Sequence, residues 1–218
     1  MKTWILLGAP GAGKGTVAEM LVQEANVRHV STGDMLRSAI KAGTPVGLEA
    51  RGYMERGELV PDKTILDLVG DLIRSEASDR TILFDGFPRT KDQAAGLDLL
   101  LAGFGGKVDA VFQLDVPEAL LIDRLAGRRV CRACGAVYHI RNIPTRVDKV
   151  CDKCGGEVIQ RPDDTEETVR NRLAVYARQT LELIAFYRER GVLFDIAAGG
   201  PRQETLQAVL RAAASHSV

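Results

Sequence analysis

The chain reads Gly8-Ala9-Pro10-Gly11-Ala12-Gly13-Lys14-Gly15-Thr16 directly after a short apolar run, residues 4–7, and directly before a stretch of helical period. An apolar run of this length is typical of a buried strand, so a glycine-rich turn joins a strand to a helix. The glycines let successive backbone N–H groups point at phosphate oxygens at the positive end of the helix, and Lys14 adds a compact charge. The segment therefore predicts a phosphate-binding loop.

This loop departs from the general pattern at one position. A Ser or Thr normally follows the lysine and binds Mg²⁺ through its hydroxyl. Here Gly15 follows Lys14, and the hydroxyl comes one residue later at Thr16. We therefore do not expect Thr16 to bind Mg²⁺ directly.

Further short apolar runs alternate with helical patterns along the chain. Together with the first run they lie at residues 4–7, 27–30, 82–85, 110–115 and 192–196. Such runs are typical of strands buried on both faces, and strand–helix alternation favours a parallel sheet. A long helix is expected over residues 166–189, where apolar positions recur at intervals of three and four. We predict an α/β fold with an open five-stranded parallel sheet and helices on both faces.

Two segments break this alternation. Residues 31–61 carry short helical patterns punctuated by glycine and proline, and residues 127–164 hold all four cysteines together with β-prone side chains. Both are expected to be insertions at the carboxyl edge of the sheet, where open α/β folds bind their ligands.

Composition excludes some classes of protein. The 218 residues are 45% hydrophobic and 27% charged, and no run approaches the roughly 18 consecutive apolar residues that a membrane span needs. Lys+Arg and Asp+Glu both number 29, so net charge gives no reason to expect a nucleic-acid or membrane partner. The apolar run at residues 4–7 is too short for a secretory signal, so a cytoplasmic location is expected. Residues 124–178 are nevertheless locally basic, with twelve cationic against seven acidic residues.

The cysteines form two identical short motifs. Cys131-Arg132-Ala133-Cys134-Gly135 and Cys151-Asp152-Lys153-Cys154-Gly155 each let two thiolates bind one ion. Two such motifs give a closed tetrahedral site, for which structural Zn²⁺ is the leading assignment. An iron–sulfur centre is the rarer alternative, and disulfides are disfavoured in a reducing compartment. His139 is not needed as a ligand when four sulfurs are available.

Four stretches together resemble the adenylate kinases, within the nucleoside monophosphate kinases. They are residues 8–16, residues 31–37 (STGDMLR), residues 85–89 (DGFPR) with Gln93, and residues 161–164 (RPDD). The match is closest to the long form with a cysteine-bearing lid. It implies a P-loop NTPase-type core at 1–30, 62–126 and 165–218, a helical monophosphate-binding insertion at 31–61, and a β-rich zinc lid at 127–164. It also implies the reaction ATP + AMP ⇌ 2 ADP with Mg²⁺ as cofactor.

The resemblance assigns roles to individual residues. It places ATP on Gly11, Ala12, Gly13, Lys14, Gly15, Thr16, Arg128, Val137, Tyr138 and Gly200. It places AMP on Thr32, Arg37, Glu58, Leu59, Val60, Gly86, Phe87, Pro88, Arg89, Gln93, Arg161 and Arg172. Phosphoryl transfer is expected to depend on Lys14, Arg89, Arg128, Arg161, Arg172 and, through hydrated Mg²⁺, Asp85. Arg124 and Arg129 are weaker candidates.

Two alternative functions remain open. The chain could phosphorylate UMP, CMP or GMP, although Thr32, Gln93 and the long lid favour AMP. It could also be a zinc-ribbon ATPase that binds nucleic acid, although Tyr138 is the only aromatic residue near the cysteines that could stack on a base. The expected partners are thus ATP, AMP and ADP, with no nucleic acid or membrane, and the expected state is a monomer.

Overall fold

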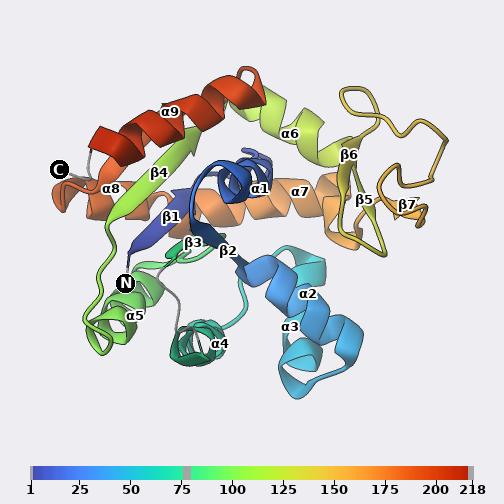
Figure 1. Ribbon diagram of the computed structural model, residues 1–218. Helices are drawn as coiled ribbons and strands as arrows, with labels where there is room; N and C mark the ends of the chain where they lie inside the picture. The colour runs from blue at the N-terminus through green and yellow to red at the C-terminus, as the bar shows by residue number, and fades with distance from the viewer. Residues whose placement is uncertain (1, 76–79, 216–218) are drawn as a thin grey trace.

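The computed structural model describes residues 2–75 and 80–215, and its centre is a parallel β-sheet (Figure 1). The sheet has five strands in the order β2-β3-β1-β4-β8. They are β1 (Thr3–Leu7), β2 (Val27–Ser31), β3 (Thr81–Asp85), β4 (Ala110–Asp115) and β8 (Leu193–Ala197). The prediction of a five-stranded parallel sheet is confirmed, with each strand within about one residue of its expected place.

Helices cover both faces of this sheet, because alternate strand residues point to opposite sides. Ile5 faces a cluster with α4, α5 and α8, whereas Leu6 faces a second cluster with α1, α6 and α9. In Figure 1, α9 lies along one face and α4 and α5 lie along the other. The bounds are α1 (Lys14–Glu24), α4 (Asp62–Ser75), α5 (Lys91–Ala102), α6 (Glu118–Ala126), α8 (Glu182–Glu189) and α9 (Arg202–Ser215).

The two segments that break the alternation have structures of their own. Residues 31–61 contain α2 (Thr32–Ala42) and α3 (Pro45–Arg56), which pack against each other. Residues 127–164 contain a three-stranded antiparallel sheet in the order β6-β5-β7, formed by Val137–His139, Arg128–Cys131 and Val158–Ile159. Figure 1 shows this small sheet at the end of α6 and α7 (Glu166–Val175), beyond the edge of the large one.

The expected continuous helix over residues 166–189 is wrong in its middle. The structure has α7 (Glu166–Val175), a π-helical turn (Tyr176–Thr180) and then α8. Leu181 N donates to Tyr176 O at 3.1 Å, five residues back, which is the wide hydrogen bond of a π turn. The buried Thr180 hydroxyl donates to Arg89 O at 2.9 Å. Thr180 therefore serves a polar contact rather than the apolar stripe that its spacing suggested.

None of the helices within residues 2–75 and 80–215 combines the length and the apolar character that crossing a membrane requires.

The contact between α2 and α3 depends on one glycine. A Cβ at Gly47 would lie 2.2 Å from Ala39 O, which is backbone and cannot move aside cheaply. We predict that Gly47→Ala lowers the free energy of unfolding by about 1–3 kcal/mol or more, because α2 and α3 must move apart to make room for the methyl group. Urea denaturation measures this change.

Gly52, which lies in α3 together with Gly47, is the matched control. A Cβ there would meet only the flexible end of Arg56, at 3.2 Å. Gly52→Ala should raise the free energy of unfolding by up to about 1 kcal/mol, since alanine is the better helix former. Shifts of the same sign in both variants would contradict this description of the α2–α3 contact.

Candidate functional site

The glycine-rich loop wraps the start of α1 at the carboxyl end of β1. Gly13, the residue before the helix, has a φ of 94°, a left-handed conformation that glycine adopts without strain. No side chain caps this helix, so its first N–H groups are available to an anion. Lys14 Nζ donates to Gly8 O at 2.7 Å and to Ala9 O at 3.0 Å, which holds the ammonium inside the loop.

The electrostatics around Lys14 favour a negatively charged ligand. Burial lowers the pKa of Lys14 to about 8, and Asp85 partly opposes that shift. The positive charges of Arg89, Arg172 and Arg128 contribute to this lowered value. A phosphate group bound among these cations would reverse the effect, because it favours the charged ammonium.

Three arginine side chains meet two aspartates beside this loop. Arg128 donates to both carboxylate oxygens of Asp164, at 2.7 and 2.5 Å, and Arg161 donates to both oxygens of Asp163, at 3.0 and 2.9 Å. Arg172 bridges the two, with Nη1 3.0 Å from Asp164 Oδ1 and 3.1 Å from Asp163 Oδ2. Asp164 is 0% exposed, and the three arginines are mostly buried.

These charged groups shift one another's pKa values. Burial acts to raise the pKa of Asp163, but Arg161 and Arg172 outweigh it and hold that pKa far below its usual range. Burial lowers the pKa of Arg172 to about 10. The Asp163 carboxylate thus stays ionised and compensates part of the positive charge that the arginines bring into the site.

A pocket opens beside the arginines. Its lining comes from the first insertion, residues 31–61, and from segments that follow it in the chain. Ten of the residues expected to hold the monophosphate line it: Thr32, Arg37, Glu58, Leu59, Val60, Gly86, Arg89, Gln93, Arg161 and Arg172. The Thr32 hydroxyl donates to Gly86 O at 3.1 Å, which ties α2 to the turn after β3. Arg89 Nε donates to the same oxygen at 2.7 Å.

Asp85 lies at the carboxyl end of β3, between the loop and the pocket. A Cβ at Gly15 would come within 3.5 Å of Asp85 Oδ2, so this carboxylate lies directly beside the phosphate loop. His29 Nε2 lies 3.3 Å from the same oxygen and orients it from β2. An acidic group in this position can hold hydrated Mg²⁺ against nucleotide phosphates.

The four cysteine sulfurs gather in one cluster. All four Sγ atoms lie within 4.8 Å of one another, with Cys131 and Cys154 at 3.5 Å and Cys134 and Cys151 at 3.6 Å. Tetrahedral coordination at a metal–sulfur distance of about 2.3 Å requires sulfurs about 3.7 Å apart, so the cluster fits such an ion. These residues could therefore hold a metal.

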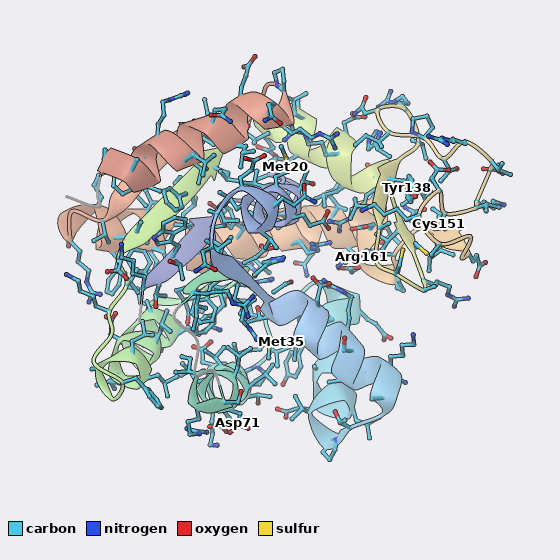
Figure 2. All side chains as sticks on the ribbon, in the orientation of Figure 1. Met20, Met35, Asp71, Tyr138, Cys151 and Arg161 are labelled. Atoms are coloured by element: carbon cyan, nitrogen blue, oxygen red, sulfur yellow. The ribbon has the colours of Figure 1, made fainter. Side chains whose placement is uncertain are left out.

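Tyr138 faces this cluster. Its hydroxyl lies 3.3 Å from Cys151 Sγ, and hydrogen bonding from that hydroxyl is the main reason why the pKa of Cys151 falls to about 6. Figure 2 labels Tyr138, in the small sheet, close to Cys151, with Arg161 nearer to the core. A lowered thiol pKa favours the thiolate that binds metals.

Two further arginines support the backbone. Arg124 donates to Ala198 O at 3.2 Å and so holds the loop between β8 and α9. Arg129 donates to Ala126 O and Arg128 O, at 3.1 and 2.7 Å. Within the described residues, both guanidinium groups thus make scaffold contacts beside the site.

The comparisons with known proteins agree with this geometry. A family model described as adenylate kinase matches residues 6–192. The chain belongs to the adenylate kinase family. It is 50% identical over 192 residues to an adenylate kinase of Carboxydothermus hydrogenoformans, with 88% of this chain and 90% of that one covered. It is 48% identical over 193 residues to an adenylate kinase of Methanocella arvoryzae, covering 88% and 89%. Its activity is the adenylate kinase reaction, reversible phosphoryl transfer from ATP to AMP.

Not every residue expected to bind a nucleotide lines this pocket. Phe87 and Pro88 are buried, and the Phe87 ring packs against Phe84 with 5.5 Å between centroids. Tyr138 is buried against the cysteines, whereas its neighbour Val137 is exposed. Gly200 is exposed at the loop that Arg124 holds. Phe87 and Pro88 are therefore core residues next to the pocket and do not line it.

The pocket also contains residues that the sequence did not single out. These are Gly33, Leu36, Met54, Gly57, Ile65 and Asp163. Ile65 belongs to a repeat with Leu68, Val69 and Leu72 at helical spacing, which indicates a core position and hides a ligand contact. Asp163 belongs to the quoted RPDD stretch, and its role as counter-charge emerges only when Arg161 and Arg172 are seen around it.

The cysteine cluster generates a stability prediction. We expect Cys151→Ala to lower the metal content per chain and the thermal unfolding midpoint more than it lowers turnover at moderate temperature, because none of the four cysteines lines the pocket. Elemental analysis and calorimetry measure both. Asp148→Ala, at an exposed position of the same segment, is the control. Equal metal per chain in variant and parent would show that the cluster is not a metal site.

The lowered pKa of Lys14 generates a pH prediction. Above pH about 8 the free protein loses the Lys14 proton, and ATP, which binds the charged form, must restore it. The dissociation constant for ATP should therefore rise by up to about ten-fold per pH unit above 8 and stay flat below it. Calorimetric titration from pH 7 to 9.5 measures this. In Lys14→Arg the profile should be flat, because guanidinium keeps its proton; identical profiles would refute the assignment.

Proposed function

We propose that this adenylate kinase holds ATP and AMP head to tail at the carboxyl edge of the sheet and transfers the phosphoryl group in line between them, in the presence of Mg²⁺. Such a transition state spreads negative charge over the moving group, so catalysis consists mainly of positioning and charge neutralisation. The observation that carries the proposal is the clustering of cations beside one pocket. Arg89, Arg128 and Arg172 lie close enough to Lys14 to lower its pKa, and Arg89 and Arg172 also line the pocket.

The donor occupies the loop side in this proposal. The loop residues Gly11 to Thr16 bind the ATP phosphates through backbone N–H groups and Lys14, and Arg128 reaches them from β5. Val137, Tyr138 and the backbone at Gly200 lie near the ATP base, Tyr138 through its main chain because its ring is buried. Asp85 orients Mg²⁺ through its water shell.

The acceptor occupies the pocket. Arg37 and Arg89 bind the AMP phosphate, since two guanidinium forks suit a dianion. The adenine lies among Thr32, the backbone of Glu58, Leu59 and Val60, and the Gln93 amide. Arg161, near the carboxyl end of the second insertion, and Arg172, in α7, serve both nucleotides.

The architecture proposed for this reaction has three parts. Residues 1–30, 62–126 and 165–218 form the core, residues 31–61 bind AMP, and residues 127–164 form a lid that closes over ATP and excludes water. Zn²⁺ on Cys131, Cys134, Cys151 and Cys154 would make the lid rigid without entering the chemistry, because a small segment lacks a sufficient core of its own. The protein is proposed to act as a cytoplasmic monomer that balances adenine nucleotides.

A coupled assay of ADP formation tests this proposal. ATP is supplied with AMP, GMP, CMP or UMP, each with and without Mg²⁺. We expect turnover with AMP to exceed that with the other monophosphates and to depend on Mg²⁺. A preference for another monophosphate would show that AMP is not the acceptor.

The same assay tests the arginine forks. Arg89→Lys should lower kcat/KM for AMP by about 100-fold or more, because an ammonium cannot reproduce a bidentate contact with phosphate. Arg74→Lys, at an exposed arginine of α4, is the matched control and should leave the rate unchanged. A rate for Arg89→Lys within two-fold of the parent would remove Arg89 from the proposed site.

A further inference from the structure

The side chain of Gln93, which lines the pocket, is held at both ends of its amide. Gln93 is 2% exposed and lies in the first turn of α5. Its Oε1 accepts from Arg89 N at 2.7 Å, and its Nε2 donates to Asp62 Oδ1 at 2.7 Å. Asp62 is the first residue of α4 and is not among the residues that line the pocket.

The two partners permit only one orientation of this amide. A backbone N–H can only donate, and an ionised carboxylate can only accept. Exchanging the oxygen and nitrogen of Gln93 would place its oxygen against Asp62 and its NH₂ against the N–H of Arg89. Two hydrogen bonds would then become two repulsive contacts in a buried place, where unpaired polar groups are costly.

Both partners are themselves fixed. Asp62 Oδ2 accepts from the Thr90 hydroxyl at 2.9 Å, which leaves Oδ1 turned to Gln93. Thr90 caps α5 by accepting from Gln93 N at 3.1 Å. The carbonyl of Arg89 accepts from the Thr180 hydroxyl of the π turn, so the residue that presents its N–H to Gln93 is also held through the next peptide.

The amide keeps one donor and one acceptor for a ligand. A primary amide offers two N–H groups and two oxygen lone pairs, and the contacts above use one of each. What remains is a donor and an acceptor side by side, in an order set by Asp62 and Arg89. A ligand base placed in the pocket meets this fixed order.

Adenine and guanine differ in the pattern that such an amide reads. Adenine pairs an amino donor with a ring-nitrogen acceptor, whereas guanine carries a carbonyl acceptor at the position of that amino group. A freely rotating amide could turn over to suit either base. A locked amide pairs with one of the two bases. With the other base it places donor against donor and acceptor against acceptor.

We propose that Asp62 is a specificity-determining positioning residue, which locks the Gln93 amide in the orientation that accepts adenine and rejects guanine. The inference rests on the proposed acceptor site and adds to it a residue that contacts no nucleotide. Sites with buried, oriented hydrogen-bonding groups discriminate strongly between analogues, because the wrong one leaves those groups unpaired.

The test compares AMP with GMP in variants of Asp62. In Asp62→Ala the amide loses the partner that opposes its rotation, so the ratio of kcat/KM for AMP to that for GMP should fall ten-fold or more. Asp62→Ser, which keeps a residue favoured at helix starts but too short to reach Gln93, should show the same fall if the alanine variant does not fold. Asp92→Ala is the matched control, since Asp92 is an exposed acidic residue in the first turn of α5.

The outcomes separate the possible roles of Asp62. If Asp62 merely connects α4 to α5, both monophosphates lose turnover equally and the ratio stays within two-fold of the parent, which would overturn the inference while the proposed acceptor stands. A parent protein that uses AMP and GMP equally would overturn the proposed acceptor and the lock together. A fall in the ratio in the Asp62 variants, absent in Asp92→Ala, would support the lock.

Discussion

Buried positive charge at the carboxyl edge of the sheet is the feature on which the rest of the site depends. Lys14, Arg89 and Arg172 lie in surroundings that lower the pKa of each group, chiefly through burial. Asp163 and Asp164 compensate part of this charge through short ion pairs. Burying unpaired cations is expensive, so a site of this kind is completed by an anion. Nucleotide phosphates meet that requirement.

The cations come from separate parts of the chain, so a ligand that binds all of them connects several structural elements. Lys14 begins α1, Arg37 lies in α2, and Arg128 lies in β5. In the proposed mechanism a bound pair of nucleotides joins these elements, since its phosphates contact all of them. The aspartates that now face Arg128 and Arg161 hold the arginine forks in place between turnovers.

The sequence predicts the scaffold well and the contacts inside it less well. Strands buried on both faces leave dense apolar runs, and repeated cysteine motifs leave an unambiguous spacing, so both are visible without coordinates. The π turn is not visible, because helices flank it on both sides and residues 176–180 contain no glycine or proline to mark a break. The direction of the Tyr138 hydroxyl toward Cys151 and the contact of Asp62 with Gln93, 31 residues away, depend on packing between elements. No local pattern encodes such contacts.

The central claim is that one continuous site holds two nucleotides with their phosphates between the loop and the arginines. A crystal structure with two adenosines joined by five phosphates tests it most directly. The account predicts one molecule that runs from the loop at Lys14 into the pocket at Gln93, with its phosphates on Arg89 and Arg128. A mimic bound at another surface, or absent at saturating concentration, would contradict it.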